Sequence, residues 1–296
     1  MTKASRPTLV LKKLSKRYRG SSSFALEDLS LTVRSGEIFG FLGPNGAGKT
    51  TTIRLIMDFI RPTSGSVSIF GKNVANGSAI GHADIGFLSA DSVMYPQWTA
   101  QQHIDFVSAI NGDTRRAGEL AKQFGLDLQR KYHRLSSGNK QKLALVLALM
   151  NEPKVLILDE PTRGLDPLLQ QELYAMLRQF SRKGGTVFMS SHNLGEVEHI
   201  CDRVGIIKDG KLVASETMQS LRRMHIHEVT VVFAGAYNRV DFELQNVEIK
   251  KASKTELVAH VRGDLNGIIR TIGKYKVHDV EITHVSLEEM FLRYYQ

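Results

Sequence analysis

The spacing of apolar and polar positions divides the chain into short strands and helices. A strand-like run at 9–11 and an alternating segment at 29–33 indicate half-buried strands of an antiparallel sheet. The continuous apolar run at 155–158 is expected of a parallel strand covered on both faces, and 38–42 and 85–88 also have strand character. The pattern therefore predicts an α/β chain with an antiparallel part and a buried sheet.

A helical period begins at residue 99 and continues without a strand-like stretch. We therefore expect a helical insert at about 97–150, between two halves of a sheet. A helix at 168–180 and a strand at 186–190 follow. Two further strands flank Asp209 and Gly210, a sequence typical of a hairpin turn.

The C-terminal quarter of the chain has a different pattern, with short strand candidates separated by polar turns. A helix at 265–272 and a second one at 286–295, which begins at Ser286, interrupt these strands. We therefore place a domain boundary in this region. Residues 1–221 form the larger domain, and residues 222–296 form a small C-terminal α+β domain.

Composition sets limits on the class of protein. The chain has 296 residues, of which 42% are hydrophobic, enough for a full core in one large and one smaller domain. A single cysteine, Cys201, excludes an internal disulfide and fits a reducing, cytoplasmic setting. The basic N-terminus lacks the apolar core of a signal peptide, and no apolar run approaches the ~20 residues of a membrane span.

The net charge of +9 leaves the partner open. Such a charge suits nucleic acid, an anionic membrane surface or a solvated face. The basic residues are scattered, and no basic stripe is interleaved with aromatic residues. The charge alone therefore selects none of these.

A glycine-rich loop links the strand at 38–42 to a helical pattern. Its sequence is Gly43-Pro44-Asn45-Gly46-Ala47-Gly48-Lys49-Thr50-Thr51, which fits the Walker A pattern G-x-x-x-x-G-K-[ST]. Glycines let the backbone curl and direct its N–H groups at phosphate oxygens, and the helix start adds a positive dipole. Lys49 supplies a charge for the β- and γ-phosphates, and the Thr50 hydroxyl is a Mg²⁺ ligand. An ordinary glycine-rich turn would not need this strand and helix, so we predict a nucleotide site.

Two acidic residues end the apolar run at 155–158. Asp159 would lie at the carboxyl end of its strand, where open α/β sheets place ligands, and its carboxylate suits Mg²⁺. Glu160 would then reach the water that attacks the γ-phosphate, as general base or orienter. His192 follows the next strand at the same edge, and its position leaves open a structural role or a role at the γ-phosphate.

Two other positions have more than one interpretation. Ser136 precedes a helix as a candidate N-cap, so this helix start either is simply capped or binds a nucleotide held by another subunit. Tyr18 lies in a polar turn, where its ring could stack on adenine, but its position alone favours packing.

The order of these motifs resembles the ATP-binding subunits of ABC transporters over residues 9–216. In the resemblance, the run 155–159 with Glu160 is the Walker B motif, His192 is the switch histidine and Tyr18 is the aromatic residue that stacks on adenine. The family's signature corresponds to Leu135-Ser136-Ser137-Gly138-Asn139, and its D-loop corresponds to Arg163-Gly164-Leu165-Asp166. The resemblance implies a P-loop NTPase core.

The chain departs from the family pattern at two places. Ser137 stands for a glycine and Asn139 for a glutamine of the signature, a variant that resembles the drug- and antibiotic-exporting branch, as does the C-terminal tail. The glutamine that usually follows the strand at 85–88 is absent. Asp91 stands nearby and is our candidate replacement as a Mg²⁺ and coupling residue.

The resemblance implies a Mg²⁺-dependent ATPase that powers an exporter. Two copies would enclose two ATP molecules, and ATP would close the pair. Each ATP would be held by the Walker A loop of one chain and by residues of the other: Ser136, Ser137, Gly138, Asn139 and Asp166. The expected partners are ATP, a second ATP-binding subunit and an integral-membrane permease, which would hold the chain at the cytoplasmic face of the membrane.

Two other functions are alternatives to a transporter ATPase. A soluble ATPase of the same superfamily that acts on nucleic acid or ribosomes would use the positive charge for phosphate contacts. Such members usually have two ATPase halves or long coiled coils, and this chain has neither, so we expect no nucleic-acid partner. A GTPase needs an N-K-x-D motif, and Asn139-Lys140-Gln141-Lys142 lacks its aspartate.

Overall fold

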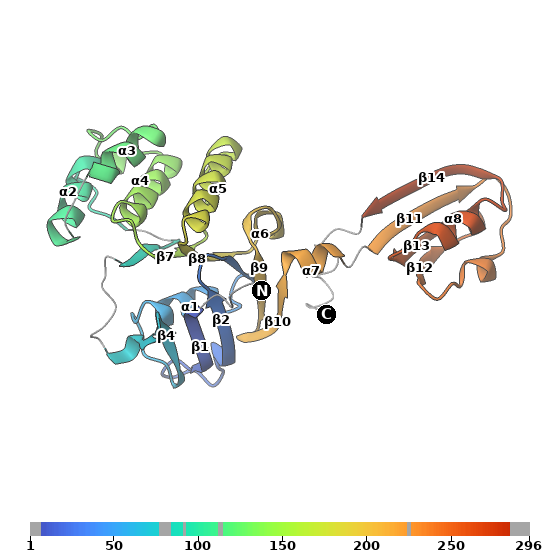
Figure 1. The fold of residues 1–296 in the computed structure, drawn as a ribbon, viewed down its shortest axis with the longest axis horizontal. Coiled ribbons are helices and arrows are strands. Elements are labelled where there is room, and N and C mark those ends of the chain that lie inside the picture. Colours follow the sequence, from blue (N-terminus) through green and yellow to red (C-terminus); the bar gives the residue numbers. More distant parts are fainter. Residues whose placement is uncertain (1–6, 77–83, 91–92, 112–114, 224–225, 285–296) are drawn as a thin grey trace. The chain divides into compact units, whose positions relative to one another are not determined.

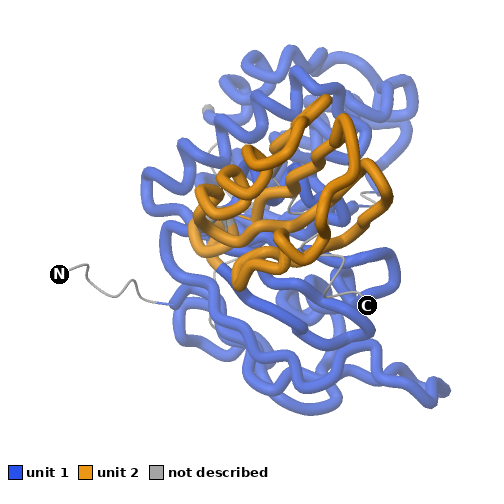
Figure 2. The backbone as a smooth tube through the Cα atoms, turned by 90° about the vertical axis from the view of Figure 1, so that its right-hand side faces the viewer, with its two compact units in different colours: residues 1–216 blue, residues 217–296 orange. Residues whose placement is uncertain are grey.

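The computed structural model describes residues 7–76, 84–90, 93–111, 115–223 and 226–284 (Figure 1). The candidate metal ligand Asp91 and the predicted helix at 286–295 lie outside these residues. The chain forms two compact units, 1–216 and 217–296 (Figure 2). The boundary expected from the sequence, between 221 and 222, falls within helix α7 (Met218–Arg223).

A six-stranded sheet forms the centre of the first unit, in the order β10-β9-β3-β8-β7-β6. The pairs β3–β8, β3–β9, β7–β8 and β6–β7 are parallel. Because β8 lies between β3 and β7, the residues that follow these three strands meet at one edge of the sheet. The strands are β3 (Ile38–Leu42), β6 (Ile85–Leu88), β7 (Val155–Asp159), β8 (Thr186–Ser191), β9 (Arg203–Lys208) and β10 (Lys211–Thr217).

A second, antiparallel sheet has the order β2-β1-β4-β5. Helix α1 (Lys49–Ile56) contacts both β4 of this sheet and β7 of the central sheet. Its buried Ile53, Leu55 and Ile56 share one apolar core with both sheets, which fixes the helix behind its loop. The strands are β1 (Pro7–Lys16), β2 (Leu26–Arg34), β4 (Ser64–Ile69) and β5 (Lys72–Asn73), followed by a 3₁₀ turn at Val74–Asn76.

Three helices form the predicted insert: α2 (Ala100–Asn111), α3 (Arg115–Gln123) and α4 (Ser137–Leu149). Helix α4 contacts both of the others and strand β6. Helices α5 (Pro167–Arg182) and α6 (Leu194–Ile200) contact β3 and β8, on the face of the central sheet opposite α1 (Figure 1). Among the described residues, no helix has the length and apolar character needed to cross a membrane.

The second unit has its own sheet, in the order β12-β13-β11-β14, with antiparallel pairs. Helix α8 (Asn266–Ile272) buries Ile268 and Ile272 in an apolar core with residues of β11 and β13. The strands are β11 (Ile226–Phe233), β12 (Val247–Ala252), β13 (Glu256–Arg262) and β14 (Val277–His284), with a 3₁₀ turn at Arg239–Phe242. This unit is therefore a small α+β fold.

Candidate nucleotide-binding site

The loop at 43–51, called the phosphate loop below, joins β3 to α1 through glycines that no other residue could replace without strain. Gly48 precedes α1 with φ +109°, and a Cβ atom there would lie 2.7 Å from Leu26 Cδ2. A Cβ atom on Gly43 would lie 2.6 Å from the carbonyl oxygen of Ile207. No side chain caps the start of α1. The loop is thus tightly enclosed, and its helix start is not closed by a side chain of the loop.

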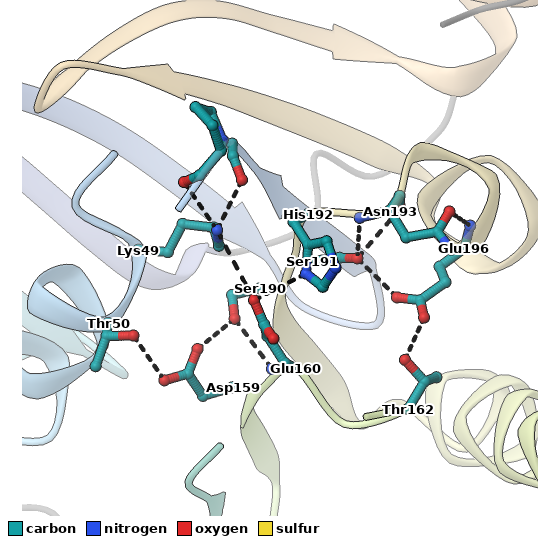
Figure 3. Close-up of polar contacts among 12 residues, drawn as sticks. Lys49, Thr50, Asp159, Glu160, Thr162, Ser190, Ser191, His192, Asn193 and Glu196 are labelled. Carbon is teal, nitrogen blue, oxygen red and sulfur yellow. Dashed lines mark hydrogen bonds and ion pairs between the residues drawn. The ribbon is translucent and has the colours of Figure 1, made fainter. Parts of the chain in front are cut away.

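The Lys49 side chain lies inside the phosphate loop. Its ammonium group donates to the carbonyl oxygens of Gly43, at 2.7 Å, and Pro44, at 3.1 Å (Figure 3). Lys49 is only 6% exposed, and this burial lowers its pKa, while the carboxylates of Glu160 and Asp159 oppose the shift. The Lys49 amino group is therefore placed inside the loop, on carbonyl contacts that phosphate oxygens can replace.

The Asp159 carboxylate is held at both oxygens. Thr50 Oγ1 donates to Oδ2 at 3.0 Å, and Ser190 Oγ donates to Oδ1 (Figure 3). A carboxylate beside a hydroxyl is a suitable pair of oxygen ligands for Mg²⁺, which usually keeps several waters and takes further ligands from phosphates. The described residues hold no group of three His, Cys, Asp or Glu side chains, so they offer no all-protein metal cage. This pair therefore fits a metal bound together with a nucleotide.

Glu160 brings the remaining predicted groups together. Its Oε1 lies 3.0 Å from His192 Nδ1 and 3.9 Å from Lys49 Nζ. The Glu160 side chain is 16% exposed and that of His192 is 58% exposed, so the pair lies at the solvent side of Lys49. Residues that follow β3, β7 and β8 thus converge as the parallel order of these strands requires.

Four polar residues around this site were missed by the sequence analysis: Thr162, Ser190, Ser191 and Glu196. The Glu196 carboxylate accepts hydrogen bonds from Ser191 Oγ, at 2.7 Å, and from Thr162 Oγ1. It thereby ties the end of β8 to the segment that follows Glu160. The only signal in the sequence was that two small polar residues end an apolar strand, which does not reveal their partners.

Tyr18 lies beside the phosphate loop, with its hydroxyl 3.3 Å from Thr51 Oγ1. It is 39% exposed, and Lys16 Nζ lies 5.5 Å from the centre of its ring. A hollow of about 740 Å³ opens next to Gly46, with Phe24 among its lining residues. The Tyr18 ring is thus near the loop and partly accessible.

The signature and D-loop residues form a second group at the starts of two helices. Ser136 caps α4, since its Oγ accepts from the N–H of Asn139 at 3.3 Å. Asp166 caps α5 through the N–H of Leu169 at 3.0 Å. The two starts lie close together, because a Cβ atom on Gly138 would be 3.4 Å from the carbonyl oxygen of Gly164. The structure thus places Ser136, Ser137, Gly138, Asn139 and Asp166 together.

The relatives of this chain identify its family. A family model described as ABC transporter matches residues 26–163. The uncharacterised ABC transporter ATP-binding protein YhcH of Bacillus subtilis (strain 168) is 34% identical over 300 residues, which cover 96% of this chain and 94% of that protein. The chain belongs to the ATP-binding proteins of ABC transporters.

Other members of the ABC transporter family extend this comparison. The bacitracin transport ATP-binding protein BcrA of Bacillus licheniformis is 32% identical over 292 residues, which cover 95% of this chain and 94% of that protein. A dimeric ATP-binding cassette, solved in a post-hydrolysis state with ADP and Pi, matches with a TM-score of 0.64 and 25% identity, over 71% of this chain and 98% of that one. These similarities confirm the predicted P-loop NTPase core.

Membership of the ABC family also settles the class of activity. The chain is an ATP-binding, ATP-hydrolysing subunit of an ABC transporter. Subunits of this family dimerise and work with membrane components, so the main function predicted from the sequence holds over a soluble ATPase that acts on nucleic acid. The roles of the individual site residues remain predictions.

Proposed function

We propose that this ABC subunit binds Mg²⁺–ATP in its phosphate loop and hydrolyses it at the carboxyl edge of the central sheet. The observation that carries the proposal is the convergence of Lys49, which follows β3, with Asp159 and Glu160 at the end of β7. In this proposal Tyr18 stacks on the adenine. The phosphates are surrounded by the phosphate loop, which consists of Gly43, Pro44, Asn45, Gly46, Ala47, Gly48, Lys49, Thr50 and Thr51.

Each acidic residue has a separate task. Thr50 and Asp159 hold Mg²⁺, which when bound neutralises charge on the phosphates. Glu160 Oε1 accepts the proton of the attacking water, a contribution typically worth about 10²- to 10⁴-fold in rate. His192, 3.0 Å from the same oxygen, orients Glu160 and senses the γ-phosphate. Asp91, which lies outside the described residues, is proposed as a further contact to the metal.

Closure of two subunits completes the site. In a homodimer of this chain, the ATP held by the partner subunit would be contacted by Ser136, Ser137, Gly138, Asn139 and Asp166. The dimeric relative with ADP and Pi supports this proposal. Two nucleotides would thus be enclosed between the subunits, and their hydrolysis would reopen the pair.

The transporter is proposed to be an exporter. Its relative BcrA is named as a bacitracin transport protein, and the variant signature resembles the same branch. The ATP-driven closure would move an integral-membrane permease, and the subunit would sit at the cytoplasmic face of the membrane through that permease.

A single substitution tests the proposed hydrolysis. Glu160→Gln keeps the shape of the side chain but removes the base, so ATP hydrolysis falls by about 10²-fold or more, while ATP binding persists. Steady-state phosphate release and calorimetric ATP binding measure the two effects. Light scattering with ATP detects the trapped dimer. The matched control Glu119→Gln, at an exposed position of α3, hydrolyses ATP as the wild type does.

Two results would contradict the proposal. Wild-type hydrolysis by Glu160→Gln would remove the assigned base. A Glu160→Gln protein that stays monomeric when saturated with ATP would remove the closed dimer, even if hydrolysis is lost.

A further inference from the structure

Strand β8 carries a buried hydroxyl at its carboxyl end. Val187, Phe188 and Met189 fill the middle of the strand, and each is fully buried. Ser190 follows them and is also 0% exposed. Burial of a hydroxyl is unfavourable unless hydrogen bonds satisfy it, so the partners of this group indicate its task.

Both partners of the Ser190 hydroxyl are at the Walker B motif. Its proton is donated to Asp159 Oδ1, and its oxygen accepts the backbone N–H of Glu160 at 3.1 Å (Figure 3). A serine hydroxyl has one proton and two lone pairs, so it makes both bonds at once. A single side chain thus contacts both acidic residues of the site.

The sheet register explains why these groups meet. Ser190 and Asp159 are paired across the parallel strands β8 and β7, so their side chains point to the same face of the sheet. Asp159 Oδ2 accepts from Thr50 at 3.0 Å, and the Ser190 bond at Oδ1 fixes the other end of the carboxylate. The carboxylate is therefore prevented from rotating, with Oδ2 directed at Thr50.

The second bond supports a strained residue. Glu160 has φ +49°, a left-handed conformation that is unfavourable for a residue with a side chain. Its N–H bond to Ser190 Oγ anchors the backbone just before this turn. This backbone turn places Glu160 Oε1 3.0 Å from His192 Nδ1 and 3.9 Å from Lys49 Nζ.

We propose that Ser190 is a positioning residue for ATP hydrolysis, which orients the Asp159 carboxylate for the metal and anchors the turn that carries Glu160. The inference rests on the proposed metal site at Thr50 and Asp159. In this role Ser190 acts through Asp159 and Glu160 and needs no contact of its own with nucleotide or metal. It acts as the hydrogen-bonded partners behind metal ligands do, whose loss typically weakens metal binding by about 10- to 100-fold.

The test compares two buried hydroxyls on the same strand. Thr186, at the opposite end of β8, bonds Thr8 Oγ1 at 3.1 Å and the N–H of Gly36 at 3.2 Å. Ser190→Ala and Thr186→Val each remove a buried hydroxyl from β8. Both variants are expected to lose stability, but only the first faces the Walker B motif.

The experiment measures metal binding without turnover in the full chain. Mn²⁺, as a spectroscopic substitute for Mg²⁺, is titrated by electron paramagnetic resonance against protein saturated with a non-hydrolysable ATP analogue. The affinity for the same analogue in EDTA is measured in parallel. We expect Ser190→Ala to weaken Mn²⁺ binding by about 10-fold or more, with metal-free analogue binding unchanged, and Thr186→Val to leave both unchanged.

Further variants distinguish a folding defect from failure of the Ser190 role and from failure of the proposed metal site. Ser190→Cys fills the position with a slightly larger side chain that is a weaker donor, so it shows the same loss if Ser190→Ala does not fold. Wild-type Mn²⁺ affinity in the folded Ser190 variants, or an equal loss in Thr186→Val, would overturn the inference. Asp159→Asn tests the metal site itself. If it binds Mn²⁺ as the wild type does, the proposed metal site fails, whereas a loss confined to Asp159→Asn overturns the role of Ser190 alone.

Discussion

Helices α1 and α4 begin in opposite ways. Helix α1 follows Gly48, whose backbone is left-handed, and no side chain caps its first turn. Helix α4 follows Ser136, whose backbone is extended and whose hydroxyl accepts the N–H of Asn139. The first N–H groups of any helix lack partners within the helix and attract anions. One helix start is therefore left for a ligand, while the other is capped by its own chain.

The two helix starts are therefore suited to different roles in phosphate binding. The phosphate loop is shaped for an anion before one arrives, because its glycines fit where a Cβ atom would clash. The Ser136 turn is a stable helix cap by itself, close to Gly164 of the neighbouring loop. This contrast fits the proposed dimer, in which α1 holds the ATP and α4 of the partner subunit closes over it.

The largest expected effect is a change in ATP affinity, which differs between substitutions of the lysines at the two helix starts. Lys49→Ala removes the charge inside the phosphate loop, so ATP affinity falls by about 100-fold, the loss expected for a charge-assisted hydrogen bond worth roughly 3 kcal/mol. Lys140→Ala, in the first turn of α4, keeps wild-type affinity in the isolated subunit, because Lys140 lies over the Tyr132 ring instead. Isothermal titration calorimetry measures both. Equal dissociation constants for the two variants would break the comparison.

A pair of glycine substitutions has the next largest effect. Gly48→Ala places a Cβ atom 2.7 Å from Leu26 Cδ2 at φ +109° and costs at least about 2 kcal/mol of unfolding free energy. Gly138→Ala places one 3.4 Å from the nearest atom, within α4, and changes stability by less than about 1 kcal/mol. Urea unfolding followed by circular dichroism compares them. A Gly48→Ala protein as stable as Gly138→Ala would show that the loop is not closely enclosed.

The smallest effect concerns the cap of α4. Ser136→Ala removes the acceptor for the N–H of Asn139 and lowers the unfolding free energy by about 1 kcal/mol. Ser137→Ala, one residue later and inside the helix, keeps the cap and serves as the control. The same unfolding measurement applies. If Ser137→Ala is the more destabilised variant, Ser136 is not the functional cap.

The elements that carry the site follow from local sequence patterns. The apolar run before Gly43, the glycine spacing and Lys49 predicted the loop between a strand and a helix, and the structure has β3 and α1 there. The run that ends in Asp159 predicted β7 in the same way. Helix α6 was not predicted, because its seven residues carry only Val197 and Ile200 as buried apolar side chains.

The sequence by itself determined the strands and helices that carry the site, α6 excepted, and the charged residues at their ends, because periodicity and glycine placement are local properties. The structure alone decided that β8 lies between β3 and β7, and therefore that Ser190 meets Asp159 and that Glu196 joins Ser191 to Thr162. Ser190 and Asp159 meet across adjacent strands although they are 31 positions apart, and Thr162 and Glu196 are 34 positions apart. Strand order is a property of the packed sheet, so a pattern within any one segment cannot specify it.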